Sequence, residues 1–250
     1  MILHYYERGD RNNQTILFIH GSASDATVWL NELNIIASRG FHCLAFDLRG
    51  HGDTRNLIQP SEKVKLDIDT HIHDTIETLN HLGVDGPIIL VTHSFGGIVA
   101  VNIAERYPDL VEKIVLVCLP AKLIFPIKHF LHFLLGKPLY FIQANLDFFK
   151  NTPLRPRYKS SITTNAQVLR EIYKHVKSWN SFRKVPKLKA RVFFAAGRFD
   201  LVSPAHLIYL LHEKTKNSCF ELFKWSSHAL MEDEPVKFQE WLYYCLSTET

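Results

Sequence analysis

Residues 88–97 read IILVTHSFGG, a largely apolar run that leads into a serine and, one residue later, two glycines. Apolar and β-branched residues in succession are typical of a strand that is buried on both faces of a parallel sheet. The next residues, Phe95–Arg106, have the spacing of a helix, and Pro108 would end it. A serine at a sharp turn from strand to helix presents its hydroxyl above the sheet, so Ser94 is a candidate nucleophile.

The turn at Ser94 makes a steric demand on its neighbours. The strained backbone crowds the residues two before and two after the serine, which should therefore be small. Gly96 satisfies this demand, whereas Thr92 stands where the pattern G-x-S-x-G has its first glycine. A serine at a helix start is usually only an N-cap. We favour the nucleophile hypothesis because the strand, the serine and the glycine pair occur together.

Similar short apolar runs recur along the chain and alternate with segments of helical period. The expected strands are 15–20, 41–47, 87–93, 113–119, 191–196 and 219–224, with an edge strand at 2–7 before them. The expected helices are 29–38, 67–82, 95–106, 165–179, 205–214 and 236–246. This alternation predicts an α/β fold with a doubly wound, mostly parallel sheet.

The alternation stops between residues 120 and 189, where no strand pattern appears. This segment is aromatic and basic, and we expect it to be helical. Seventy residues are too many for a plain crossover, so we predict a helical lid over the carboxyl ends of the strands, where ligands bind in such sheets. The predicted organisation is a core domain of residues 1–119 and 190–250 with the lid as an insert.

Four further motifs follow expected strands in order along the chain. They are His20-Gly21-Ser22-Ala23, Asp47-Leu48-Arg49-Gly50-His51-Gly52, Gly197-Arg198-Phe199-Asp200 and Ser227-His228. Together with His93-Ser94-Phe95-Gly96-Gly97, this set resembles the α/β-hydrolase family over nearly the whole chain. The family also shares the order Ser, Asp, His along the chain.

The resemblance implies a serine hydrolase with a catalytic triad of Ser94, Asp200 and His228. A serine hydroxyl is a poor nucleophile at neutral pH, so His228 would take its proton and later return it to the leaving group. Asp200 would hold the second imidazole nitrogen and fix the tautomer. The non-catalytic alternatives are a turn residue for Asp200 and a surface or core histidine for His228, which is one of 14 in the chain.

The resemblance also implies an oxyanion hole, which stabilises the negative oxygen of the tetrahedral intermediate. Its donors would be the backbone N–H of Phe95 and one from the loop after His20, at Ser22 or at Ala23. We expect His20 itself to shape that loop, and Asp47 to organise a loop below the site.

Other chemistries find less support in the sequence. The family includes dehalogenases and epoxide hydrolases, which have aspartate as nucleophile at this turn, and Ser94 argues against both. Phosphate-binding glycine loops are absent, so we expect no cofactor. We expect no metal either, since His71 and His73 would point in different directions from one helix. We interpret Glu232–Glu234 as a solvated approach to a helix, and the four cysteines as free thiols.

The composition, with 46% hydrophobic and 22% charged residues, is typical of a globular protein. Charge is uneven, because residues 120–189 hold 14 basic and 2 acidic residues against 15 and 23 elsewhere. This basic lid could steer an anionic substrate, an acidic carrier protein or an anionic membrane surface, or could simply be solvated. We expect no nucleic-acid binding. The basic residues considered for steering are Lys122, Lys128, Lys137, Arg155, Arg157 and Lys159.

Substrate class is less well defined by the sequence. Aromatic lid residues that do not pack against the sheet would line an apolar pocket, and we predict this for Phe125, Phe130, Phe141 and Trp179. The favoured function is hydrolysis of small to medium hydrophobic carboxylic esters through an acyl-enzyme. Three alternatives stay open: a thioesterase or esterase for acyl groups on an acidic carrier protein, a C–C bond hydrolase, and a non-catalytic ligand receptor.

The location expected from the sequence is cytoplasmic. The first residues lack the basic start and apolar run of a signal peptide. The most apolar stretch, 123–149, is interrupted by charged residues and prolines, so we predict no transmembrane segment.

Overall fold

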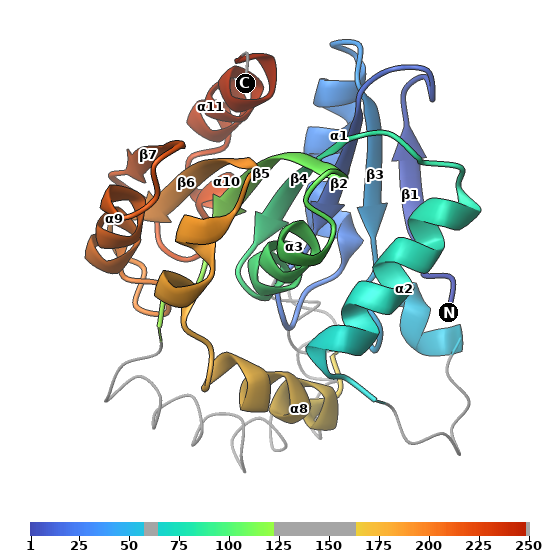
Figure 1. The fold of residues 1–250 in the computed structure, drawn as a ribbon, viewed down its shortest axis with the longest axis horizontal. Coiled ribbons are helices and arrows are strands. Elements are labelled where there is room, and N and C mark those ends of the chain that lie inside the picture. The colour runs from blue at the N-terminus through green and yellow to red at the C-terminus, as the bar shows by residue number, and fades with distance from the viewer. Residues whose placement is uncertain (58–64, 123–163, 249–250) are drawn as a thin grey trace, which may run out of the picture.

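A seven-stranded sheet with the order β1-β3-β2-β4-β5-β6-β7 forms the centre of the protein (Figure 1). The structure is a computed structural model that describes residues 1–57, 65–122 and 164–248. β1 runs antiparallel to β3, and all other neighbouring strands are parallel. The strands are β1 Tyr5–Arg8, β2 Thr15–Ile19, β3 His42–Phe46, β4 Ile88–His93, β5 Val111–Val117, β6 Arg191–Gly197 and β7 Ser218–Phe223. The predicted α/β sheet is confirmed.

Helices cover both faces of the sheet and enclose two hydrophobic cores. α2, α3 and α9 pack into one core, and α1, α10 and α11 into the other. Figure 1 shows α2 and α3 in front of the sheet and α1 behind it. The helices are α1 Leu30–Ala37, α2 Ile68–His81, α3 Phe95–Arg106, α8 Ala166–Val176, α9 Ala205–Glu213, α10 Leu230–Asp233 and α11 Pro235–Ser247. Short 3₁₀ turns are η1 Ala26–Trp29, η2 Gly52–Leu57, η3 Ser181–Arg183 and η4 Val185–Lys187.

The central strands are apolar on both sides because both faces of the sheet are covered. Every residue of β2, β3 and β4 is buried. β1 is shorter than the predicted edge strand at 2–7. The backbone N–H of Leu3 instead donates to the Thr78 hydroxyl, and that of His4 donates to the Thr54 hydroxyl. Side chains of α2 and η2 thus satisfy backbone groups that a longer strand would have paired.

The segment predicted as a lid leaves the sheet and returns to it at one place. The backbone N–H of Ser181 donates to the Ala121 carbonyl at 2.9 Å, and its hydroxyl donates to the Pro120 carbonyl at 2.9 Å. Its described part holds α8, which lies beyond the ends toward which β3 and β4 point (Figure 1). Residues 123–163 are outside the described part, so the lid itself stays a prediction. No helix in the described ranges is long and apolar enough to cross a bilayer.

The strand order reverses between β2 and β4. After β2 the chain adds β3 on one side, then returns to place β4 on the other. Ligands bind in the crevice outside such a reversal, at the carboxyl ends of the strands. The loops after β2 and β4 meet here, since a methyl group added at Gly21 would lie 3.2 Å from Cβ of Ser94.

Candidate active site

Ser94 occupies a strained turn between β4 and α3. Its backbone has φ +50° and ψ −114°, in a region that non-glycine residues rarely adopt. The turn is held by two backbone hydrogen bonds, from Ser94 N–H to the Val117 carbonyl and from Gly97 N–H to the Ser94 carbonyl. Strain of this kind persists where the surrounding structure enforces it, and it clusters at functional sites.

Packing around this turn excludes a side chain at position 96 but accommodates one at position 92. A methyl group at Gly96 would lie 2.5 Å from the carbonyl oxygens of Ile19 and His20, so no side chain fits there. Thr92 takes the place of the usual glycine because its side chain is directed toward β5. Its hydroxyl donates to the Val115 carbonyl at 3.0 Å, and the residue is fully buried. The departure from G-x-S-x-G therefore leaves the turn intact.

The structure brings Ser94, His228 and Asp200 together. Nε2 of His228 lies 3.0 Å from Oγ of Ser94, and Nδ1 of His228 lies 2.7 Å from a carboxylate oxygen of Asp200. His228 follows β7, Asp200 follows β6 and Ser94 follows β4, so all three side chains come from carboxyl ends of strands. Both distances are within hydrogen-bond reach. The arrangement can pass a proton from the serine hydroxyl to the imidazole.

Asp200 is a buried, well-paired carboxylate, with 3% of the residue exposed. The backbone N–H groups of Val202 and Ser203 donate to Oδ1, which leaves Oδ2 for His228. Burial alone would raise the pKa of Asp200, but the charge and hydrogen bond of His228 and the Ser203 amide lower it below the ordinary value. An ionised Asp200 accepts a hydrogen bond from Nδ1–H of His228, so Nε2 carries no proton and can accept from the Ser94 hydroxyl.

Two acidic residues hold the loop that carries His228. Asp233 accepts hydrogen bonds from the backbone N–H and hydroxyl of Ser227, at 2.9 and 2.7 Å. Glu234 accepts from the Trp225 N–H and from the Ser226 hydroxyl, at 2.9 and 2.6 Å. Glu232–Glu234 does lead into α11 at Pro235, and Asp233 is exposed, but the prediction of a solvated approach to a helix missed these bonds to the loop. The partners precede the acids by only six to nine residues, and the charge pattern alone gave no sign of them.

The loop after β2 lies against the Ser94 turn, as an oxyanion loop must. Nδ1 of His20 contacts the Gly21 carbonyl at 2.7 Å, and its Nε2 accepts from the Leu48 N–H at 2.9 Å. Phe95 is the first residue of α3, where backbone N–H groups have no partner within the helix. The predicted donors at Phe95 and Ser22 thus lie on the two segments that meet at the site. Their assignment as an oxyanion hole stays a prediction.

Asp47 organises the loop after β3, as the sequence suggested. Its carboxylate accepts from the backbone N–H groups of Ala26 and Asp53, at 2.7 and 2.9 Å, and contacts Nδ1 of His4 at 2.8 Å. The residue is buried, and this burial raises its pKa. Its role is structural, because its hydrogen bonds join loops rather than reach Ser94.

The predicted substrate-binding residues are mostly beyond the described part of the chain. This holds for Phe125, Phe130 and Phe141, and for every basic residue considered for steering except Lys122, which is exposed. Trp179 is described, and its ring packs against the larger hydrophobic core while its indole N–H donates to the Ser181 hydroxyl at 2.6 Å. No described contact joins Trp179 to the triad. Its place in a substrate pocket stays a prediction.

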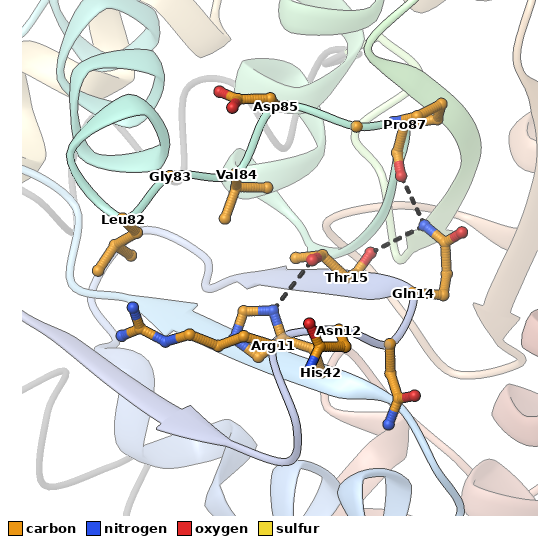
Figure 2. A pocket seen from close by; sticks show the side chains of 12 residues that line it. Arg11, Asn12, Gln14, Thr15, His42, Leu82, Gly83, Val84, Asp85 and Pro87 are labelled. Carbon is orange, nitrogen blue, oxygen red and sulfur yellow. Dashed lines mark hydrogen bonds between the residues drawn. The ribbon is translucent and has the colours of Figure 1, made fainter.

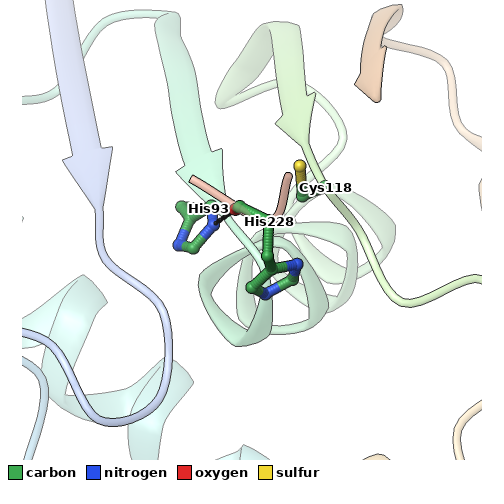
Figure 3. Close-up of side chains that lie close together, drawn as sticks. All are labelled: His93, Cys118 and His228. Atoms are coloured by element: carbon green, nitrogen blue, oxygen red, sulfur yellow. Dashed lines mark hydrogen bonds between the residues drawn. The ribbon is translucent and has the colours of Figure 1, made fainter. Parts of the chain in front are cut away.

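Histidine and cysteine side chains near the triad are engaged with the protein. His93, Cys118 and His228 have ligand atoms within 4.8 Å of one another (Figure 3). Both ring nitrogens of His228 already contact Asp200 and Ser94, and Nε2 of His93 contacts the His228 carbonyl. Hydrogen bonding within the protein explains this group better than a cation site. All four cysteines are free thiols, as predicted.

Comparison with known sequences identifies the protein family. The sequence profile of the alpha/beta hydrolase fold matches residues 14–170. The chain belongs to the α/β-hydrolase family. Human epoxide hydrolase 4 is 27% identical over 170 residues, which are 68% of this chain and 44% of that protein. A putative esterase/lipase of Haemophilus influenzae is 33% identical over 109 residues, 42% of this chain and 34% of that one. The matched part thus spans less than half of these curated relatives.

Solved α/β-hydrolase structures superpose on nearly the whole chain. An esterase from Exiguobacterium antarcticum has a TM-score of 0.82 and 18% identity, covering 98% of this chain and 96% of its own. The enol-lactonase of Burkholderia xenovorans has a TM-score of 0.81 and 17% identity over the same shares. Identities this low support a shared fold and leave the substrate to other arguments.

Proposed function

We propose that this protein is a serine hydrolase that cleaves carboxylic esters of small to medium hydrophobic substrates through an acyl-enzyme on Ser94. The observation that carries the proposal is the 3.0 Å separation between Oγ of Ser94 and Nε2 of His228, together with the hydrogen bond between Nδ1 of His228 and Asp200. A nucleophile, a base and a residue that orients the base are the three parts that acyl transfer requires.

The reaction follows from these positions. Ser94 Oγ attacks the ester carbonyl while its proton passes to Nε2 of His228. Backbone N–H groups of Phe95 and Ser22 stabilise the resulting oxyanion, and each such donor is worth about 2.7–4 kcal/mol. The intermediate collapses, the alcohol leaves with the proton from His228, and the acyl group stays on Ser94. Water, deprotonated by His228, then releases the carboxylic acid and restores the serine.

The nucleophile separates this proposal from epoxide hydrolysis, the activity in the names of several relatives. A carboxylate that opens an epoxide forms an ester, which water can hydrolyse at its carbonyl. A serine that opens an epoxide would form an ether, which offers no carbonyl to water and would end turnover. Ser94 therefore favours substrates that themselves carry an acyl group.

Three other functions would use the same residues or fold: a thioesterase for carrier-bound acyl groups, a C–C bond hydrolase and a ligand receptor. We test them with a panel of p-nitrophenyl esters of graded length, an acyl thioester, a β-diketone and styrene oxide. We expect the highest kcat/KM for a short or medium ester and no turnover of the epoxide. Higher kcat/KM for the thioester or diketone would replace the ester proposal, and no turnover of any acyl substrate would favour the receptor.

A further inference from the structure

His93 lies between the loops of the site, one residue before Ser94 (Figure 3). It is only 5% exposed, and its Nε2 lies 2.7 Å from the backbone carbonyl oxygen of His228. A carbonyl oxygen can only accept a hydrogen bond, so Nε2 of His93 carries the proton and donates it. The last residue of β4 is thus bonded to the main chain of a residue 135 positions later.

The same imidazole also faces the loop after β2. A methyl group at Gly21 would lie 2.8 Å from Nδ1 of His93, which is closer than a side chain can approach without displacing the ring. The rings of His93 and His228 are 4.8 Å apart between centroids. One buried side chain therefore contacts the loop assigned to the oxyanion hole and the loop that carries the base.

We propose that His93 is a positioning residue, whose Nε2–H holds the main chain of His228 so that the His228 imidazole stays within reach of Ser94. The proposal rests on the proposed function, because it assumes that His228 acts as the base. Asp200 holds the ring of His228, whereas His93 holds its backbone. These constraints are complementary, and misplacing a catalytic group by about 1 Å can lower the rate about 100-fold.

Three substitutions of His93 separate the hydrogen bond from the volume of the side chain. His93→Leu fills the space without a donor. The amide of His93→Gln reaches the position of Nε2, whereas that of His93→Asn reaches only the position of Nδ1. For each variant we measure kcat and KM on a p-nitrophenyl ester, the rate of labelling by a fluorophosphonate, and the melting temperature.

We expect His93→Leu and His93→Asn to lose about 10- to 100-fold in kcat and in labelling rate, with KM within about threefold of wild type. His93→Gln should recover to within about fivefold. A role in packing alone would instead lower the melting temperature and leave kcat per folded molecule unchanged.

A matched control is His42, a second buried histidine at the opposite end of the strands (Figure 2). Its ring nitrogens contact the Thr15 hydroxyl and the Glu7 carboxylate, at 3.0 and 2.9 Å. His42→Leu should reduce stability and leave kcat within about twofold of wild type. A loss of kcat in His42→Leu as large as that in His93→Leu would overturn the positioning role.

The outcomes separate the two proposals. If wild-type protein is not labelled, the proposed function fails, whatever His93 does. If wild type is labelled and His93→Leu is labelled within threefold of its rate, the role of His93 fails and the proposed function stands. Should His93→Leu not fold, the other two variants decide: the Gln variant must be at least about twofold faster than the Asn variant, and a smaller difference contradicts the role.

Discussion

The carboxyl ends of the parallel strands differ from their amino ends in backbone strain. Among the described residues, the three non-glycine residues with positive φ are Ala23, Ser94 and Cys118, which follow β2, β4 and β5. A chain of hydrogen bonds joins Ser94, His228 and Asp200 at the same ends. Backbone strain and hydrogen-bonded titratable groups thus occur together at the carboxyl ends of the strands.

Within the described ranges, the amino ends offer space without this backbone strain at a hydroxyl-bearing residue. A hollow of about 360 Å³ lies there, open to solvent and lined mainly by polar residues (Figure 2). Its hydrogen bonds tie segments together, such as the 2.6 Å bond from the Gln14 amide to the Pro87 carbonyl. His42 links the Thr15 hydroxyl to the Glu7 carboxylate here, at 3.0 and 2.9 Å, but Thr15 is the first residue of β2 and has no strained backbone turn. The strained turn at the hydroxyl of Ser94, and not the volume of a hollow, therefore distinguishes the candidate site.

The largest effect is expected for Ser94→Ala at the carboxyl ends. Without the hydroxyl no acyl-enzyme forms, so kcat should fall more than about 1000-fold, while the melting temperature changes little. Steady-state kinetics on the best ester and a thermal melt measure both. Retention of most activity would mean that another group is the nucleophile.

Substitution of two acidic residues, Asp200 in the triad and Asp233 next to its loop, separates a direct role in catalysis from an indirect one. Asp200→Asn removes the acceptor that fixes the His228 tautomer, and kcat should fall about 1000-fold or more. Asp233→Asn alters the loop bonds to Ser227 and leaves the Asp200 carboxylate on His228, so we expect a loss below about tenfold. Equal losses in the two variants would mean that Asp200 has no special part in catalysis.

Buried histidines should make stability depend on pH. Burial lowers the pKa of His51 and of His71 to about 3, against about 6.5 in the unfolded chain. Protonation therefore favours unfolding. The stability that these neutral histidines contribute is present above about pH 6.5 and is lost as the pH falls toward the folded-state value of about 3. At pH 5 each histidine should cost about 2 kcal/mol. Urea unfolding of wild type and His51→Gln at pH 7.5 and pH 5 measures this, and an identical pH dependence would contradict it.

The smallest effect is expected in the hollow at the amino ends. Arg11 lines it and forms an exposed ion pair with Glu7. Arg11→Ala should leave the urea midpoint of unfolding nearly unchanged, since exposed surface pairs contribute little to stability. It should leave kcat/KM within about twofold of wild type. A tenfold loss on the same ester would place substrate binding at the amino ends and break the contrast between the two sides.

Much of the fold and of the site could be predicted, because both depend on local patterns. Phe95–Arg106 was predicted to the residue, since the turn at Ser94 precedes it and Pro108 follows it. Ser94 was predicted from its strand–turn–helix pattern, and Asp200 and His228 from the resemblance to the α/β-hydrolase family, whose motifs follow β6 and β7.

The remainder depends on partners distant in sequence. His93 binds a backbone carbonyl, which carries no residue-type signal, and it lies 135 positions away. The shortened β1 likewise depends on hydroxyls of Thr54 and Thr78, which a strand pattern cannot reveal. The pocket residues predicted in the lid rest on composition alone, which gives no direction for a side chain.

The central claim is that His228 activates the hydroxyl of Ser94. The most direct measurement is incubation of wild type and His228→Ala with a fluorophosphonate, followed by intact mass and peptide mapping. We expect one adduct, on the peptide that contains Ser94, with labelling at least about 100-fold slower in the variant. No adduct on wild type, an adduct on a different serine, or equal labelling of both proteins would contradict the claim.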